Sequence, residues 1–159
     1  MIRKTTTLAL LAVLCILKTA AVAADLPPAG YDKSRDPAAD LKTAIAQATE
    51  ENKRILLEIG GEWCVYCRIL NQTIHDDERL SRRLHESFVV VKVNFSPDVR
   101  NEAFLSRYPQ IPTYPHIFVL EADGKLLSSQ TPDAFMQGNR YVPELILAFL
   151  DRWAPKEKA

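Results

Sequence analysis

The sequence predicts a single α/β domain with a central mixed β-sheet flanked by helices, and three observations lead to this fold class. First, segments in which apolar residues recur at helical spacing alternate with short apolar runs that are typical of buried strands. Second, a long helical stretch separates the first two runs, which favours a parallel pair joined by a right-handed crossover. Third, the tight turn Ala122-Asp123-Gly124 separates the last two runs and predicts an antiparallel hairpin.

The start of the chain has the pattern of a cleaved secretory signal. Arg3 and Lys4 supply the positive charge, residues 8–17 are all apolar, and small residues at 21–24 offer a cleavage site. Ten apolar residues are too few to span a bilayer, which takes about 20. A retained membrane anchor that extends past Lys18 is the alternative interpretation. The signal pattern predicts a protein that is periplasmic or secreted.

We expect a signal peptide over residues 1–24, an N-terminal leader over 25–35 and one folded domain over 36–155. The chain holds 20 basic and 20 acidic residues, of which the signal segment takes three basic and no acidic ones, so the mature part has a net charge of −3. It contains no basic block, so nucleic acid is not an expected partner. The mature length is enough for one hydrophobic core without disulfide support, and we expect a monomer.

The first elements can be assigned from caps and composition. Asp36 and Pro37 fit the N-cap and the first position of a helix that runs to about Glu51. Residues 54–59 form an apolar run that predicts a buried strand, and residues 88–95 form a second run rich in β-branched residues. These two runs are the expected parallel pair.

The later elements follow in the same way. Trp63 and Cys64 open a helix, and Asp76 or Asp77 caps its second section. The other expected elements are a helix over 99–108, a strand over 117–120, its hairpin partner over 125–128 and a final helix that begins at Pro143.

Two cysteines remain in the mature chain, Cys64 and Cys67, and a disulfide between residues this close braces almost no chain. Cys64 stands where a strand and two glycines deliver the chain to a helix start, and there free N–H groups and the helix dipole stabilise a thiolate. Cys67 lies one turn further on and can resolve a mixed disulfide. The sequence therefore predicts a thiol–disulfide oxidoreductase in which Cys64 attacks, Cys67 resolves and Trp63 packs beside the pair.

Residues 62–67, Glu-Trp-Cys-Val-Tyr-Cys, resemble the active-site stretch of the thioredoxin superfamily, and the element order over residues 36–153 resembles the thioredoxin fold. Glu58 lies six residues before Cys64, where the family keeps a buried acid, usually Asp, that helps to move protons at the resolving cysteine. Lys92 resembles the lysine near that acid, so the resemblance implies catalytic roles for both residues. From the residues alone, a purely structural Glu58–Lys92 pair or a solvated Lys92 stays open.

Tyr114-Pro115, followed by an apolar strand, resembles the cis-proline region of the same family. Pro112 is the alternative cis proline, but Pro115 better fits one uninterrupted strand before the hairpin. The resemblance implies that Pro115, with Trp63, Tyr114 and His116, forms the groove that binds a partner. His116 stands where the family usually has threonine, which leaves substrate preference and redox poise open.

Within the superfamily, the Cys-Val-X-Cys stretch, residues 73–86 and the strand after them are similar to the periplasmic branch with a thioredoxin-like domain such as the C-terminal domain of the DsbD disulfide reductase. This resemblance implies that the protein passes electrons to oxidised protein partners and is re-reduced by a membrane or soluble electron donor. No metal is expected, and no cofactor beyond the Cys64–Cys67 disulfide. Two alternatives stay open: a copper or zinc chaperone that uses the same cysteines with His116 as a third ligand, and a non-catalytic interaction module on the same fold.

Overall fold

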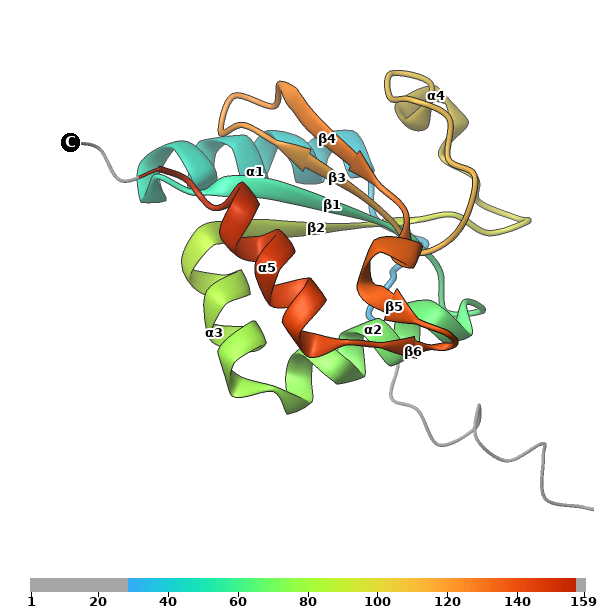
Figure 1. Ribbon diagram of the computed structural model, residues 1–159. Coiled ribbons are helices and arrows are strands. Elements are labelled where there is room, and N and C mark those ends of the chain that lie inside the picture. Colours follow the sequence, from blue (N-terminus) through green and yellow to red (C-terminus); the bar gives the residue numbers. More distant parts are fainter. Residues whose placement is uncertain (1–28, 157–159) are drawn as a thin grey trace, which may run out of the picture.

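The computed structural model describes residues 29–156, so the predicted signal segment and residues 157–159 lie outside the described part. The fold is a four-stranded sheet with helices on both faces and a small two-stranded hairpin beside it (Figure 1). The helices are α1 (Pro37–Glu51), α2 (Val65–Asp76), α3 (Glu78–Ser87), α4 (Glu102–Leu105) and α5 (Pro143–Trp153). The strands are β1 (Arg54–Gly60), β2 (Phe88–Asn94), β3 (His116–Leu120), β4 (Leu126–Gln130), β5 (Met136–Gln137) and β6 (Arg140–Tyr141), and a short 3₁₀ helix covers Pro132–Phe135. Within residues 29–156, no helix is long and apolar enough to cross a membrane.

The main sheet has the strand order β2-β1-β3-β4 and is mixed, as predicted. β1 runs parallel to β2 and antiparallel to β3, and β4 forms a hairpin with β3. In this register Glu58 lies opposite Lys92 on β2 and opposite Ile117 on β3. Because directly opposite side chains share a face of the sheet, Glu58 and Lys92 point to the same side.

Alternation along the strands sorts the apolar side chains onto two faces. One face carries Leu57 and Phe118 and is covered by α1 and α4, and α1 lies behind the sheet in Figure 1. The other face carries Leu56 and Val119 and is covered by α2, α3 and α5, of which α3 and α5 lie in front of the sheet in the same view. Burial on both faces explains why the central strands read as continuous apolar runs.

Helix caps mark where α1 and α3 begin and where α1 ends. Asp36 accepts a hydrogen bond from the N–H of Ala38 at 2.9 Å, which confirms it as the N-cap of α1. Asn52 ends α1 in the left-handed conformation, with φ at 53°. Asp77 is the N-cap of α3 and accepts a hydrogen bond from the N–H of Arg79 at 2.9 Å.

The third predicted helix is much shorter than expected. Its spacing indicates a helix over 99–108, but α4 covers only Glu102–Leu105. Asn101 adopts a left-handed φ of 53° just before α4, and the N–H of Ser96 donates to the carbonyl of Val99 at 2.9 Å in the preceding turn. These local turn contacts hold the segment out of a longer helix in spite of its apolar spacing. The β5–β6 hairpin is not predicted either, because two-residue strands contain no periodicity.

Candidate active site

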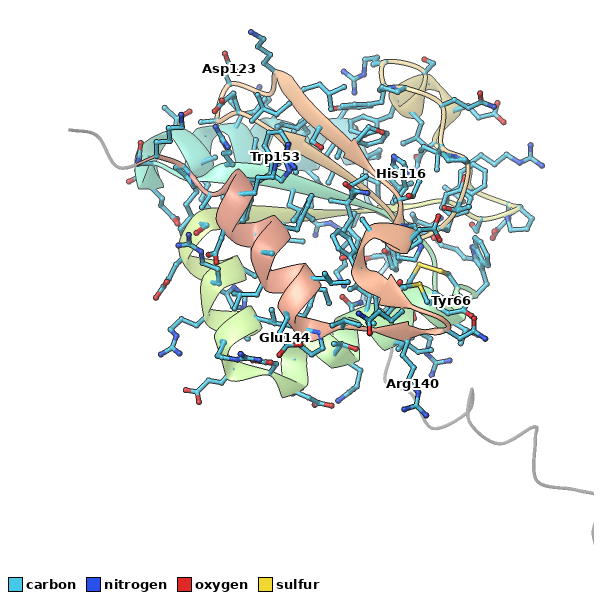
Figure 2. All side chains as sticks on the ribbon, viewed as in Figure 1. Tyr66, His116, Asp123, Arg140, Glu144 and Trp153 are labelled. Atoms are coloured by element: carbon cyan, nitrogen blue, oxygen red, sulfur yellow. A yellow bond between two sulfur atoms is a disulfide. The ribbon has the colours of Figure 1, made fainter. Side chains whose placement is uncertain are left out.

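A disulfide links Cys64 and Cys67 at the start of α2, with their Cα atoms 5.2 Å apart. Figure 2 shows its sulfurs in yellow near Tyr66, at the edge of the molecule where β1 ends. Cys64 is the N-cap of α2, and its sulfur accepts a hydrogen bond from the N–H of Cys67 at 3.1 Å. The predicted position of Cys64 at a helix start is confirmed, and the helix N–H groups there favour negative charge on its sulfur.

An exposed apolar rim surrounds the buried sulfurs. Cys64 is 4% exposed and Cys67 is 0% exposed. Trp63 is 53% exposed, and Val65 and Tyr66 are each 40% exposed; we call these three side chains the apolar rim. Of the two cysteines, only Cys64 has any exposed surface.

Behind the disulfide lies a buried carboxyl group. Glu58 on β1 is only 4% exposed. The hydroxyl of Tyr31 donates a hydrogen bond to Glu58 Oε1 at 2.8 Å, and Lys92 Nζ lies 3.7 Å from Glu58 Oε2. Partners on both oxygens offset the free-energy cost of burying the carboxyl group. The structure thus brings Glu58 and Lys92 together, while their part in the reaction stays a prediction.

The first described residues fold back onto the site and are held there by three side chains. Glu62 accepts hydrogen bonds from the N–H groups of Ala29 at 2.8 Å and Tyr31 at 2.7 Å. The carbonyl of Ala29 accepts hydrogen bonds from Asn71 Nδ2 at 2.7 Å and from Lys92 Nζ. We call this arrangement the leader clamp. It places the Tyr31 ring in one buried cluster with both cysteines.

Gly60 ends β1 at a point where no side chain fits. A Cβ atom at this position would lie 2.6 Å from Cys67 Sγ and 2.7 Å from Tyr31 Oη. Side chains two residues apart on a strand point to the same face, so both atoms lie on the side of β1 that carries Glu58. The carboxyl end of β1 therefore gathers a sulfur, a hydroxyl and a carboxyl group in a buried space.

The loop before β3 forms the other wall of the site. The Tyr114–Pro115 peptide bond is cis, so the cis proline is Pro115 and not Pro112. The Tyr114 ring packs edge-on against Trp63, with 5.6 Å between ring centroids, and stacks on Phe95 at 4.9 Å. Trp63 Nε1 donates a hydrogen bond to the carbonyl of Phe95 at 2.7 Å. The indole is thereby fixed beside the disulfide although its face is exposed.

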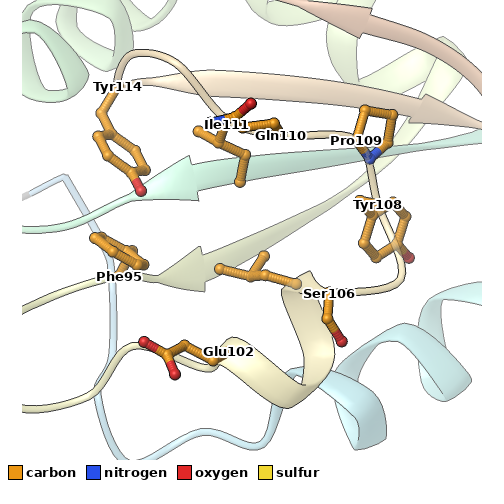
Figure 3. A pocket seen from close by; sticks show the side chains of 9 residues that line it. Phe95, Glu102, Ser106, Tyr108, Pro109, Gln110, Ile111 and Tyr114 are labelled. Carbon is orange, nitrogen blue, oxygen red and sulfur yellow. The ribbon is translucent and has the colours of Figure 1, made fainter.

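A pocket of about 350 Å³ opens next to this wall (Figure 3). Figure 3 shows Phe95 and Tyr114 together at one end of it. Leu105, Ile111 and Glu102 also line it. The pocket extends the apolar rim away from the cysteines toward α4.

A family model described as Thioredoxin-like matches residues 36–122, more than half of the chain. The chain belongs to the thioredoxin-like family. Among curated proteins it is similar to the thiol:disulfide interchange protein DsbD of Yersinia enterocolitica, with 24% identity over 105 residues that cover 66% of this chain and 18% of that protein. Among solved structures it is similar to a disulphide isomerase from Xylella fastidiosa Temecula1, with a TM-score of 0.68, 24% identity and coverage of 77% of this chain and 95% of that one. It is also similar to the oxidised DsbD C-terminal domain of Neisseria meningitidis, with a TM-score of 0.54, 16% identity and coverage of 74% and 96%.

The family match and the disulfide at the start of α2 both indicate thiol–disulfide exchange. The predicted fold class and the predicted chemistry of thiol–disulfide exchange are confirmed. The chain spans less than a fifth of the length of the curated relatives that it matches.

His116 of the thioredoxin-like domain lies away from the cysteines. It pairs with Ile59 across the β1–β3 ladder, its ring packs edge-on against Phe118 at 4.7 Å, and its Nε2 lies 2.8 Å from Ser129 Oγ. Ile59 and Phe118 belong to the face covered by α1, whereas Glu58 lies on the opposite face. The structure thus does not bring the His116 ring to the disulfide. Within residues 29–156, no group of three or more His, Cys, Asp and Glu side chains could hold a metal ion.

His116 gives the stability of the thioredoxin-like domain a dependence on pH. Burial lowers the pKa of this histidine below its usual 6.5, and its Nδ1 has no hydrogen-bond partner within residues 29–156. The folded state keeps the ring neutral while the unfolded state takes up a proton, so this stability is present above pH 6.5 and is lost as the pH falls through the lower folded-state pKa. We expect His116→Gln to flatten the decline in unfolding free energy as the pH falls below about 6.5, measured by urea denaturation.

The matched control is His75→Gln, which removes an exposed histidine on α2. This variant should keep the wild-type slope of unfolding free energy against pH. An unchanged slope in His116→Gln would contradict the assignment of the decline to His116.

Tyr31 is a site residue that sequence reasoning missed, as are Asn71 and Phe95. Tyr31 falls in the predicted leader over 25–35, where no motif or periodicity marks it. Its contacts run to Glu58 and Glu62, about thirty residues away in the chain. Contacts of this range have no local signal, so only the three-dimensional structure identifies them.

Proposed function

We propose that the mature protein is an exported thiol–disulfide oxidoreductase that reduces disulfides in protein partners. The observation that carries this proposal is the asymmetry of the two cysteines. Cys64 caps α2 beside the exposed apolar rim, whereas Cys67 is fully buried in a cluster with Tyr31, whose hydroxyl reaches Glu58. An attacking thiolate needs access and a site that favours negative charge, and a resolving thiol needs a base nearby.

Reduction of a partner takes two exchanges. The Cys64 thiolate attacks one sulfur of the partner's disulfide, forms a mixed disulfide and releases a partner thiolate, which takes a proton from water. Cys67, deprotonated with the help of Glu58, then attacks the Cys64 sulfur and releases the second partner thiolate. Lys92 Nζ, 3.7 Å from Glu58 Oε2, supplies a counter-charge for the carboxylate. The Cys64–Cys67 disulfide is the product of this cycle.

The reducing direction is supported by the resemblance of residues 62–67 and 73–86 to the thioredoxin-like domain of the DsbD disulfide reductase. The similarity to DsbD, which is named a thiol:disulfide interchange protein, supports exchange with other proteins.

A protein partner would lie across the apolar rim and along the neighbouring pocket. Trp63 and Tyr66 offer exposed aromatic surface of the kind that is enriched at protein interfaces. Tyr114 contacts Trp63 beside the disulfide and lines the pocket together with Phe95, and Pro115 follows it in the same loop. This arrangement supports a binding role for the loop before β3.

Export is supported by the basic and apolar pattern at residues 3–17. We take residues 36–155 as the domain and residues 29–31 as a part of the leader that completes its site. Each turnover leaves the pair oxidised, so a membrane-bound or soluble electron donor has to reduce it again.

The equilibrium reduction potential of the mature protein tests this function. After equilibration in dithiothreitol or glutathione buffers, intact mass should give a potential near about −270 mV, the value of thioredoxin. A potential near about −120 mV, the value of DsbA, would make the protein an oxidant and contradict the reducing direction. If no Cys64–Cys67 disulfide formed in any buffer, exchange itself would fall, and metal binding by the same thiols would become the leading function.

A further inference from the structure

The hydroxyl of Tyr31 contacts the buried carboxyl group and lies in the same buried cluster as the resolving cysteine. It donates a hydrogen bond to Glu58 Oε1 at 2.8 Å. On its other side it shares the space above Gly60 with the Cys67 sulfur, the two atoms lying 2.7 and 2.6 Å from the Cβ position of that glycine. We propose that Tyr31 relays a proton: its hydroxyl connects the Cys67 thiol to the Glu58 carboxylate while the mixed disulfide is resolved.

This inference rests on the proposed two-step exchange and adds the path of one proton. In the resolving step, Tyr31 passes its hydroxyl proton to Glu58 as it takes the thiol proton of Cys67, so Tyr31 itself ends unchanged. The Cys67 sulfur forms a bond with the Cys64 sulfur, and the bond between Cys64 and the partner breaks. The partner leaves as a thiolate and takes a proton from water. The cysteine pair is oxidised and the partner is reduced, and Glu58 later returns its proton to solvent.

The leader clamp supports a specific placement of this hydroxyl. Both carboxylate oxygens of Glu62 accept hydrogen bonds from the backbone on either side of Gly30, and one of these bonds comes from the N–H of Tyr31 itself. Asn71 and Lys92 hold the carbonyl of Ala29 from the opposite side. Side chains from the β1–α2 loop, α2 and β2 thus fix a segment that lies before residues 36–122, the range that the family model matches.

The surroundings of Tyr31 keep its hydroxyl neutral, which suits a proton relay. Burial first, and the Glu58 carboxylate second, raise the pKa of Tyr31 well above its usual value. The hydroxyl therefore stays protonated over the working pH range and can pass a proton on without forming a phenolate. The titratable groups that face it are Glu58 on β1, Glu62 in the β1–α2 loop, Cys64 and Cys67 at the start of α2, Lys92 on β2 and Tyr141 on β6.

The test follows the resolving step with an aromatic disulfide whose released thiolate is coloured, so that neither a protein partner nor an electron donor is needed. The reduced mature protein releases a first thiolate when Cys64 attacks and a second when Cys67 resolves, and stopped-flow absorbance separates the two from about pH 5 to 10. We expect Tyr31→Phe to slow the second release about tenfold near neutral pH. At alkaline pH the rate should return to that of the wild type, because hydroxide then removes the Cys67 proton directly. Glu58→Gln should have the same signature, and the double variant should lose no more than the slower single variant.

Two further variants make the result specific. Tyr141→Phe is the matched control, because it removes another buried tyrosine hydroxyl near Glu58 that has no hydrogen-bond partner in the described part of the chain; its pH profile should match the wild type. Glu62→Ala releases the leader clamp through an exposed side chain, and it should slow the second release with the same recovery at alkaline pH. It keeps the test open if Tyr31→Phe fails to fold.

The outcomes distinguish a failure of the proposed Tyr31 relay from a failure of the proposed thiol–disulfide exchange. A wild-type pH profile in Tyr31→Phe overturns the relay alone, and so does a loss by the same factor at every pH, which indicates a structural role. An equal shift in Tyr141→Phe overturns it as well. If the wild type releases no second thiolate, the proposed exchange mechanism falls and the relay falls with it.

Discussion

Replacing Cys67 with serine is expected to stop the reaction at a covalent complex between Cys64 and the partner. Cys64 keeps its helix start and its place beside the apolar rim, so the first exchange still occurs. The mature chain has no other thiol that could resolve the product. Turnover should fall on the order of 10³-fold or more, as for the loss of an essential nucleophile. Non-reducing gels and intact mass should show one partner bound to each protein molecule.

Cys64→Ser is the matched variant for this experiment. It should form no complex, because the remaining thiol, Cys67, is 0% exposed and lies behind the rim. If complexes formed with Cys64→Ser and not with Cys67→Ser, Cys67 would be the attacking cysteine and Cys64 the resolving one. Capture of partners by neither variant would favour the metal-chaperone alternative.

The elements that the sequence predicts are those with strong local signals. Asp36 caps α1 as expected, and the predicted end of that helix at Glu51 agrees with the structure. The parallel pair β1–β2 and the β3–β4 hairpin follow from apolar runs and the turn that separates the last two. The helix predicted over 99–108 is too long, because turn hydrogen bonds around Ser96 compete with its helical spacing. The spacing of apolar residues does not reveal those hydrogen bonds.

The site residues also divide into those with a local sequence signal and those without one. Cys64 and Cys67 can be assigned from spacing alone, because three residues of helix bring both sulfurs together. Glu58 and Lys92 need only the pairing of two adjacent strands, where they occupy opposite positions of one register. Tyr31 cannot be assigned in this way. Its position depends on hydrogen bonds to Glu58 and Glu62, which lie about thirty residues away in the chain.

The close packing around Gly60 is expected to affect the stability of the protein as well as its reaction. Gly60→Ala is expected to lower the unfolding free energy by about 1–3 kcal/mol, the usual cost of overfilling a packed interior. The new methyl group would lie 2.6 Å from Cys67 Sγ and 2.7 Å from Tyr31 Oη, closer than non-bonded atoms approach. Cys67 is held by its disulfide and Tyr31 by its hydrogen bond to Glu58, so neither atom can move without losing a contact. Urea denaturation of the oxidised protein measures this loss.

Gly138→Ala separates this effect from the general loss of a glycine. Gly138 has a φ of 60°, and no atom of the described residues lies within 4 Å of its Cβ position, so its substitution adds backbone strain without a contact near the cysteines. It should leave the release of the second thiolate unchanged, whereas Gly60→Ala should slow it by displacing Cys67 and Tyr31 together. An unfolding free energy of Gly60→Ala within about 0.5 kcal/mol of the wild type would mean that the space above Gly60 is not filled. Because the atoms that exclude a side chain there are also those assigned to the proton path, stability and the rate of resolution should fall together at this residue.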